Sequence, residues 1–193
     1  GWKEKRAAII TAFGFAAISL ASCAHTQPPP PVVDLAGMQC SPAVRLDDAA
    51  LLALDKDGEK RETALLDGHA HCVEEPSGYR SLYRVFALPA MAAPSIITVS
   101  ALPWGNTMLP PRATFLDASG KTVRETTHAD FTFRGPLLTA LLRSHADENY
   151  LVVLSDAEVL GHSVSRISGS VQVNYAAAGP VMIAMYSGHD TTT

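Results

Sequence analysis

Short apolar runs separated by turn residues limit the possible fold of this sequence more than any other feature. From Tyr79 onward each run is four to eight residues long, is rich in Val, Ile, Thr and Phe, and is mostly bounded by Pro, Gly, Asp or Ser. This length and composition favour strands over helices. The runs are residues 82–88, 95–102, 112–117, 122–127, 130–134, 150–154, 164–167, 170–175 and 181–186. They predict a mainly β domain, an antiparallel β-sandwich.

Three of these runs carry more specific predictions. Residues 150–154 are almost all apolar, which is typical of a strand that is buried on both faces. Residues 112–117 and 122–127 flank the turn sequence Ala-Ser-Gly-Lys, which predicts a hairpin. In residues 130–134, Phe131 and Phe133 are expected on one face, with Thr132 on the other.

Helical signals are few, and we expect one or two short helices. The candidates are residues 46–54, residues 137–142 and a turn after Ser155-Asp156, where the aspartate can cap the first turn.

The 193 residues are 47% hydrophobic and 18% charged, which excludes a disordered chain. The net charge of −4 and a pI of about 5.9 argue against nucleic-acid binding, which needs a basic face.

The N-terminal residues have the pattern of an export signal. Lys3, Lys5 and Arg6 precede an uncharged run over residues 7–22, which is too short for a typical membrane-spanning helix. A basic start followed by such a run is typical of a secretory signal peptide. The run ends in Leu20-Ala21-Ser22-Cys23, which resembles the lipobox of bacterial lipoproteins.

The lipobox resemblance implies a covalent lipid on Cys23 and cleavage just before it. More than one acyl chain gives stable membrane anchoring. Residue 24 is Ala rather than Asp, for which the family's sorting rule implies the outer membrane. We therefore expect a signal peptide over residues 1–22, a lipidated and Pro-rich tether over residues 23–39, and a β-sandwich domain over residues 40–193. The Pro28–Pro31 run favours a stiff polyproline II stalk.

The two remaining cysteines, Cys40 and Cys72, form an even pair in an exported chain. We expect them to form a disulfide, because disulfides persist in oxidising compartments. Two alternatives stay open. The cysteines can remain free thiols, or Cys72 can join His69 and His71 in a metal site, since two imidazoles on one strand face can begin a zinc or copper site.

Several features in order resemble the maltose-operon periplasmic protein family. They are a strand that ends in Leu88-Pro89, the run 96–100, a strand that ends in Phe115-Leu116-Asp117, the Phe131 and Phe133 pair, and the run 150–155. The resemblance covers about residues 40–167. It implies an exported β-sandwich that is associated with carbohydrate uptake, has no established enzymatic activity and has no catalytic residues to carry over.

The search for catalytic or ligand-binding residues yields weak candidates. Ser155, Asp156 and His162 are close in sequence, but a catalytic triad is defined by its geometry in space. Adjacent Glu74 and Glu75 are expected on opposite faces of a strand, so they are poorly placed for glycoside hydrolysis. Trp104 and Asn106, in a loop between strands, can contact a sugar or a partner protein, although a Trp in this position more often packs in the core.

The functional prediction is a non-catalytic accessory or binding protein of the periplasm. It is held at the outer membrane by lipid, is associated with maltose or maltodextrin transport, and needs no cofactor beyond that lipid. Its expected partners are the membrane, carbohydrate or envelope proteins, and not nucleic acid. The alternatives are a structural subunit of an envelope or surface assembly, and a metal-binding or hydrolytic envelope protein.

Overall fold

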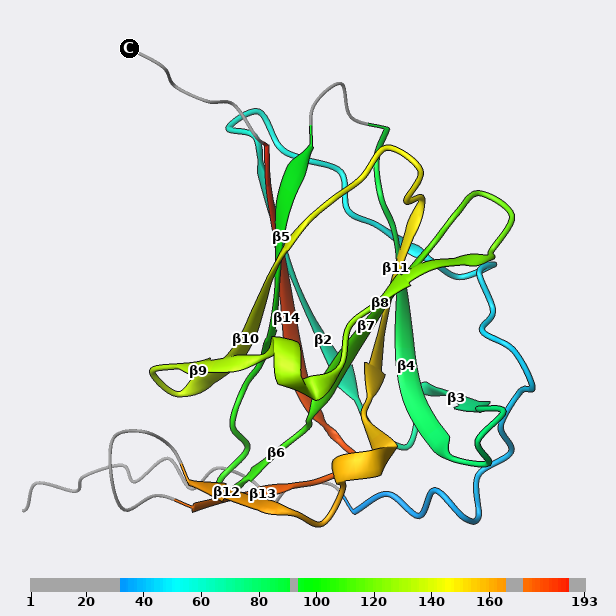
Figure 1. Cartoon of the computed structure of the whole chain (residues 1–193), viewed down its shortest axis with the longest axis vertical. Helices are drawn as coiled ribbons and strands as arrows, with labels where there is room; N and C mark the ends of the chain where they lie inside the picture. The colour runs from blue at the N-terminus through cyan, green and yellow to red at the C-terminus, as the bar shows by residue number, and fades with distance from the viewer. Residues whose placement is uncertain (1–31, 91–93, 166–171, 188–193) are drawn as a thin grey trace, which may run out of the picture.

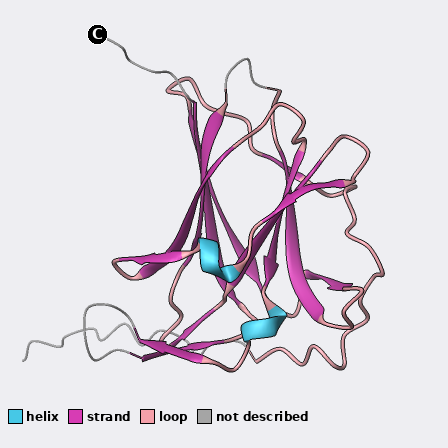
Figure 2. Cartoon of the chain, in the orientation of Figure 1, coloured by secondary structure: helices cyan, strands magenta, loops and turns pink. Residues whose placement is uncertain are grey.

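Two β-sheets packed face to face form the protein, with a small third sheet at one end (Figure 1). The computed structural model describes residues 32–90, 94–165 and 172–187. Strands dominate these residues, as Figure 2 shows, which confirms the predicted mainly β sandwich. The leader, the lipobox with Cys23, Pro28–Pro31 and parts of the expected runs 164–167 and 170–175 lie outside the described residues.

Sheet A has six strands and lies on the right in Figure 1. Its order is β1-β4-β11-β7-β8, and β3 pairs with the first half of β4 while β1 pairs with its end. The pairs are antiparallel except for β1 with β4. The bounds are β1 Ala50–Leu51, β3 His71–Glu74, β4 Arg80–Ala87, β7 Pro111–Leu116, β8 Thr122–Glu125 and β11 Tyr150–Ser155.

Sheet B has five antiparallel strands in the order β2-β14-β5-β10-β9 and lies on the left in Figure 1. Its strands are β2 Glu59–Leu66, β5 Ser95–Ala101, β9 Thr132–Arg134, β10 Leu137–Arg143 and β14 Gly179–Ser187. Sheet C is the small third sheet, in the order β12-β13-β6. It consists of β6 Thr107–Met108, β12 Ser163–Ser165 and β13 Gln172–Tyr175.

The core lies between sheets A and B. From sheet B it takes alternate residues of each long strand, such as Ile97 and Val99 of β5, and from sheet A it takes Leu151 and Val153 of β11. The other residues of β11, Val152 and Leu154, belong to a second apolar cluster on the outer face of sheet A. The prediction that this strand is buried on both faces is therefore confirmed.

The expected hairpin after β7 is also present. The Asp117 carboxylate accepts hydrogen bonds from the backbone N–H of Ser119 at 2.8 Å and of Lys121 at 3.0 Å. The Ser119 hydroxyl donates to the same oxygen, and these bonds to the charged form lower the pKa of Asp117. Gly120 has a positive φ of 82°, a conformation that glycine adopts without strain.

Of the three expected helices, the structure confirms one. Residues Ala157–Val159 form the short 3₁₀ helix η2, and the Asp156 side chain caps it by accepting from the Glu158 N–H at 3.2 Å. A second 3₁₀ helix, η1, spans His128–Asp130. Within the described residues no helix is long and apolar enough to cross a membrane.

The helices expected at residues 137–142 and 46–54 are wrong. Residues 137–142 lie in strand β10, where Leu138, Ala140 and Leu142 face the core and Leu141 is exposed. Six register pairs with β5 decide this conformation, because a Leu-rich segment can satisfy either structure locally. Residues 46–54 contain turns and β1 instead of a helix. Leu46 and Ala49 pack on the outer face of sheet A, Leu52 belongs to the main core, and Leu51 is exposed.

The folded part begins earlier than the expected boundary at residue 40. Val33, Leu35 and Met38, which we assigned to the tether, pack against the main core. These apolar side chains are partly buried, so this part of the expected tether belongs to the folded domain. The core residues within the described ranges lie between Val33 and Met185, and a chain from residue 24 onward contains all of them.

We predict that Leu151→Ala lowers the free energy of unfolding by about 2–5 kcal/mol, because it leaves a cavity under a fully buried strand. Leu51→Ala, at a leucine that is 61% exposed, is the matched control and should change stability by about 0.5 kcal/mol or less. Urea denaturation of residues 24–193 measures both values. Equal effects of the two variants would contradict the burial of Leu151 in the core between the sheets.

Candidate functional site

The point where the N-terminal segment enters the fold is the most elaborate polar site of the described residues. Cys40 in this segment forms a disulfide with Cys72 of β3, which confirms the expected pairing over the free-thiol and metal alternatives for these cysteines. The bond spans 32 positions of sequence. On the chain-entropy account a loop of this size contributes about 3–4 kcal/mol to stability.

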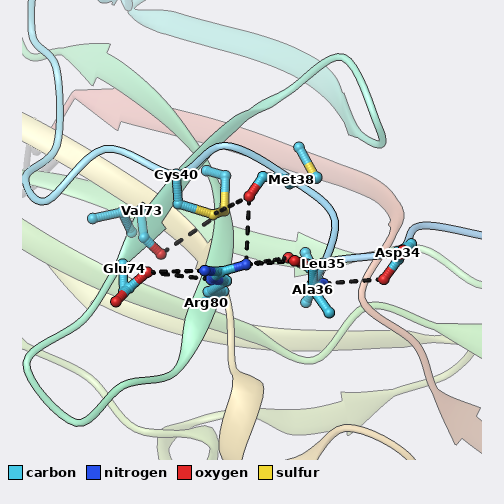
Figure 3. A network of polar contacts seen from close by, with 9 residues as sticks. Asp34, Leu35, Ala36, Met38, Cys40, Val73, Glu74 and Arg80 are labelled. Carbon is cyan, nitrogen blue, oxygen red and sulfur yellow. Dashed lines mark hydrogen bonds and ion pairs between the residues drawn. A yellow bond between two sulfur atoms is a disulfide. The ribbon is translucent and has the colours of Figure 1, made fainter.

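Arg80, the first residue of β4, holds the same segment through its guanidinium (Figure 3). Its Nη1 donates to the backbone oxygens of Leu35 at 3.2 Å, Ala36 at 2.7 Å and Met38 at 3.4 Å. Its Nε and Nη2 both lie 3.2 Å from the Glu74 carboxylate. Arginine suits this position because its planar fork offers five donors. We call Arg80, Glu74 and the Cys40–Cys72 disulfide the anchor junction.

The chain then crosses the edge of β3. The N–H of Ser41 donates to the oxygen of Cys72, and the N–H of Glu74 donates to the oxygen of Ser41, both at 2.9 Å. These bonds form a parallel bridge between Ser41 and Val73. The bridge covers a strand edge that would otherwise present unpaired backbone groups.

Residues 42–49, which we call the strap, cover the outer face of sheet A, as seen at the right of Figure 1. The N–H of Arg45 donates to the Tyr83 hydroxyl at 3.0 Å. Burial raises the pKa of Tyr83, so this hydroxyl stays neutral and able to accept the bond. His71 stacks on the Tyr83 ring with centroids 5.5 Å apart and contacts the Asp48 carboxylate of the strap.

The two histidines proposed as metal ligands have separate partners. The side chain of His69 is 96% exposed and lies beside Asp67 in the turn before β3, whereas His71 contacts Asp48 and Tyr83. Over residues 32–90, 94–165 and 172–187, His, Cys, Asp and Glu form no group of three that could hold a metal ion. The described residues therefore add no third ligand to this histidine pair.

A hollow of about 280 Å³ lies on the outer face of sheet A, beside the strap. Leu116, Val152 and Leu154 contribute apolar surface to it, and Arg112 and Glu75 form an ion pair of 2.6 Å within its lining. Both of these side chains are 18% exposed. The combination of apolar surface and a half-buried charge pair suits a small amphipathic molecule.

The Arg112–Glu75 pair is held by its surroundings. Burial lowers the pKa of Arg112, but the hydrogen bond and charge of Glu75 outweigh this effect, so the pKa is raised overall. The Ser81 hydroxyl donates to the same Glu75 carboxylate at 2.6 Å. The buried Arg112 Nε has no hydrogen-bond partner within the described part of the chain. Glu74 pairs with Arg80 instead, so the adjacent glutamates diverge, as expected.

Trp104 and Asn106 lie in the connection from β5 of sheet B to β6 of sheet C, and neither residue lines the hollow beside the strap. The backbone of Trp104 pairs with that of Thr107, and Trp104 itself is partly exposed. Asn106 is exposed, and its backbone oxygen accepts from the N–H of Asn174 at 2.9 Å. The structure thus brings this predicted pair together on one loop, next to sheet C.

The residues considered as a catalytic triad have separate positions and contacts. The Ser155 hydroxyl is buried and accepts from the N–H of Leu82 at 3.0 Å. Asp156 caps η2 and lies 3.6 Å from His128 rather than pairing with His162. The backbone of exposed His162 pairs with Tyr175 beside sheet C.

The sequence analysis missed Arg80, the strap and the Arg112–Glu75 pair. A usable sign was present for Arg112, which is a charged residue within the otherwise uncharged run 111–116. A charge in a buried strand requires a partner, so this position predicts an ion pair. The identity of that partner depends on distant residues, because Glu75 comes from the turn between β3 and β4.

Comparisons with known proteins add little. No family model matches the chain, and no curated protein matches it. Among solved structures, a pre-peptidase C-terminal domain of collagenase from Bacillus anthracis aligns with 10% identity and a TM-score of 0.35, over 74% of this chain and 98% of that one. The lipobox and the likeness to the maltose-operon family therefore rest on the sequence features alone.

We predict that Arg80→Gln loosens the segment over residues 33–40, because the bonds to three backbone oxygens and to Glu74 are lost. The expected loss of stability is about 1.5–3 kcal/mol, a typical value for hydrogen bonds of a charged group. Limited proteolysis of residues 24–193 should then cut this segment faster. Arg84→Gln, at an exposed arginine of the same strand, is the control and should leave the cleavage unchanged.

Proposed function

We propose that the protein is a lipid-anchored, non-catalytic accessory or binding protein of the bacterial cell envelope. The Cys40–Cys72 disulfide is the observation that carries the proposal. Disulfides are rare in reducing compartments, so the bond supports export. Of the three cysteines it leaves Cys23 as the odd one, directly behind the leader and in the lipobox-like sequence.

The anchor junction supports a tethered arrangement. Val33, where core packing begins, is ten positions after Cys23. In a polyproline II conformation ten positions span about 30 Å. Loss of the leader, with its three basic residues and one acidic residue, changes the net charge from −4 to −6. An acidic body is weakly repelled by anionic headgroups, so the lipid is the expected attachment to the membrane.

In this proposal the β-sandwich domain binds a ligand. The hollow beside the strap suits a small ligand, and the resemblance to the maltose-operon family suggests an association with maltodextrin uptake at the outer membrane.

A second candidate function is that of a subunit of an envelope assembly. The outer face of sheet B favours it, because no described element covers that face (Figure 1).

The anchor is tested by Cys23→Ser in cells of a bacterium that processes lipoproteins. We predict that the wild-type protein takes up labelled palmitate and partitions into the detergent phase, whereas Cys23→Ser does neither. Cys40→Ser is the control, because it removes a cysteine without removing the lipid site, and it should still be labelled. Mass spectrometry showing an unmodified Cys23 in the wild-type protein would overturn the anchor.

Carbohydrate binding is tested by tryptophan fluorescence. Trp2 lies in the leader, so Trp104 is the single tryptophan of residues 24–193. If Trp104 and Asn106 contact a sugar, titration with maltodextrins changes the emission, because stacking on a sugar ring removes water from the indole. Asn106→Ala should weaken the response, and Asn174→Ala in neighbouring β13 is the control. A flat titration would contradict a sugar site at this loop.

A further inference from the structure

The two outer faces of the sandwich differ in whether another segment of the chain packs on them. The strap lies over sheet A, whereas no described element lies over the outer face of sheet B (Figure 1). Among the described residues seven large hydrophobic side chains are exposed, and three of them, Leu65, Ile96 and Leu141, lie on this uncovered face. Leu141, on β10, is 56% exposed. This face therefore combines exposed apolar side chains with charged and polar ones, including Glu59, Arg61 and Arg143, which is a composition that an interaction surface can have.

The strand register arranges the charges of this face in a definite order. One row across the sheet runs Glu59, Tyr186, Ile96 and Arg143, on β2, β14, β5 and β10. An acidic residue therefore stands at one side of the row and a basic residue at the other. The residues between them are an aromatic and an aliphatic side chain. This row is complementary to itself when its direction is reversed.

We propose that the outer face of sheet B binds the same face of a second copy of the chain. The two-fold axis runs parallel to the strands, between β14 and β5. Rotation about this axis places β10 of the second copy opposite β2 of the first, and β5 of the second copy opposite β14 of the first. Each row then faces the same row of the second copy, because the rotation does not shift residues along the strand direction. Glu59 then meets Arg143 of the second copy, and Tyr186 meets Ile96 of the second copy. The symmetry repeats each contact, as in other isologous dimers.

The next two rows are compatible with this pairing. In the second row, Arg61 meets Leu141 of the second copy, whose apolar surface the long arginine stem can cover. Ala184 meets Thr98, which leaves room for close approach. In the third row the facing residues are uncharged: Thr63 with Thr139, and Met182 with Ser100. No like charges oppose each other in these three rows, and two aligned sheets pack about 10 Å apart in this manner.

Sedimentation of residues 24–193 over a concentration series tests the dimer. We expect the wild-type chain to be a dimer that dissociates on dilution, and Leu141→Arg to be a monomer at the same concentrations. Glu59→Arg alone and Arg143→Glu alone each raise the dissociation constant about tenfold or more, because each places like charges together. The double variant Glu59→Arg with Arg143→Glu should return it to near the wild-type value. Circular dichroism verifies that every variant is folded.

Arg84→Glu, a charge reversal at an exposed position of sheet A, is the matched control and should leave the dimer intact. A wild-type chain that stays monomeric at all concentrations overturns the proposal, as does a dimer that Leu141→Arg does not weaken. If both single charge reversals weaken the dimer and the double variant does not restore it, the proposed axis is wrong. The tested chain lacks Cys23, so these outcomes are independent of the lipid anchor.

Discussion

Sheet A has two apolar faces, and this constraint shapes the rest of the molecule. Strand β11 contributes Leu151 and Val153 to the core and Val152 and Leu154 to the outer cluster. Burial of such side chains stabilises the fold by about 25 cal/mol per Å² of apolar surface. One neighbouring sheet can cover one face only. The second cover is the strap, so the fold requires its N-terminal segment.

The anchor junction follows from the same requirement. A strap without secondary structure of its own gains little from local hydrogen bonds, so it depends on contacts at its ends. The disulfide at Cys40 and the Arg80 bonds hold one end, and the parallel pairing of β1 with β4 holds the other. If Cys23 carries lipid, the covalent path from the membrane enters the fold at this reinforced point. Among the described residues nothing covers the outer face of sheet B in this way, and this difference is the basis of the proposed contact with a second copy.

The accuracy of the sequence predictions depended on how local the decisive interactions are. Alternation and β-branched residues identified β4, β5, β7 and β11, and the turn sequence identified the β7–β8 hairpin. Strand β2 was missed because the first half of its sequence, EKRETALL, is charged and its burial arises from pairing with β14. Residues 137–142 were assigned to a helix because leucine suits both structures, and the partner strand decides between them.

The sequence by itself determined the β-rich class and indicated the Cys40–Cys72 pairing, because strand period and cysteine number are local or compositional properties. The N-terminal pattern likewise predicts export, and this stays a prediction. The tertiary structure alone decided the strap, the Arg112–Glu75 pair and the uncovered face of sheet B. Each of these depends on which strands are neighbours and on which residues share a row. Such contacts join residues far apart in the chain, and burial and register in the folded state select them.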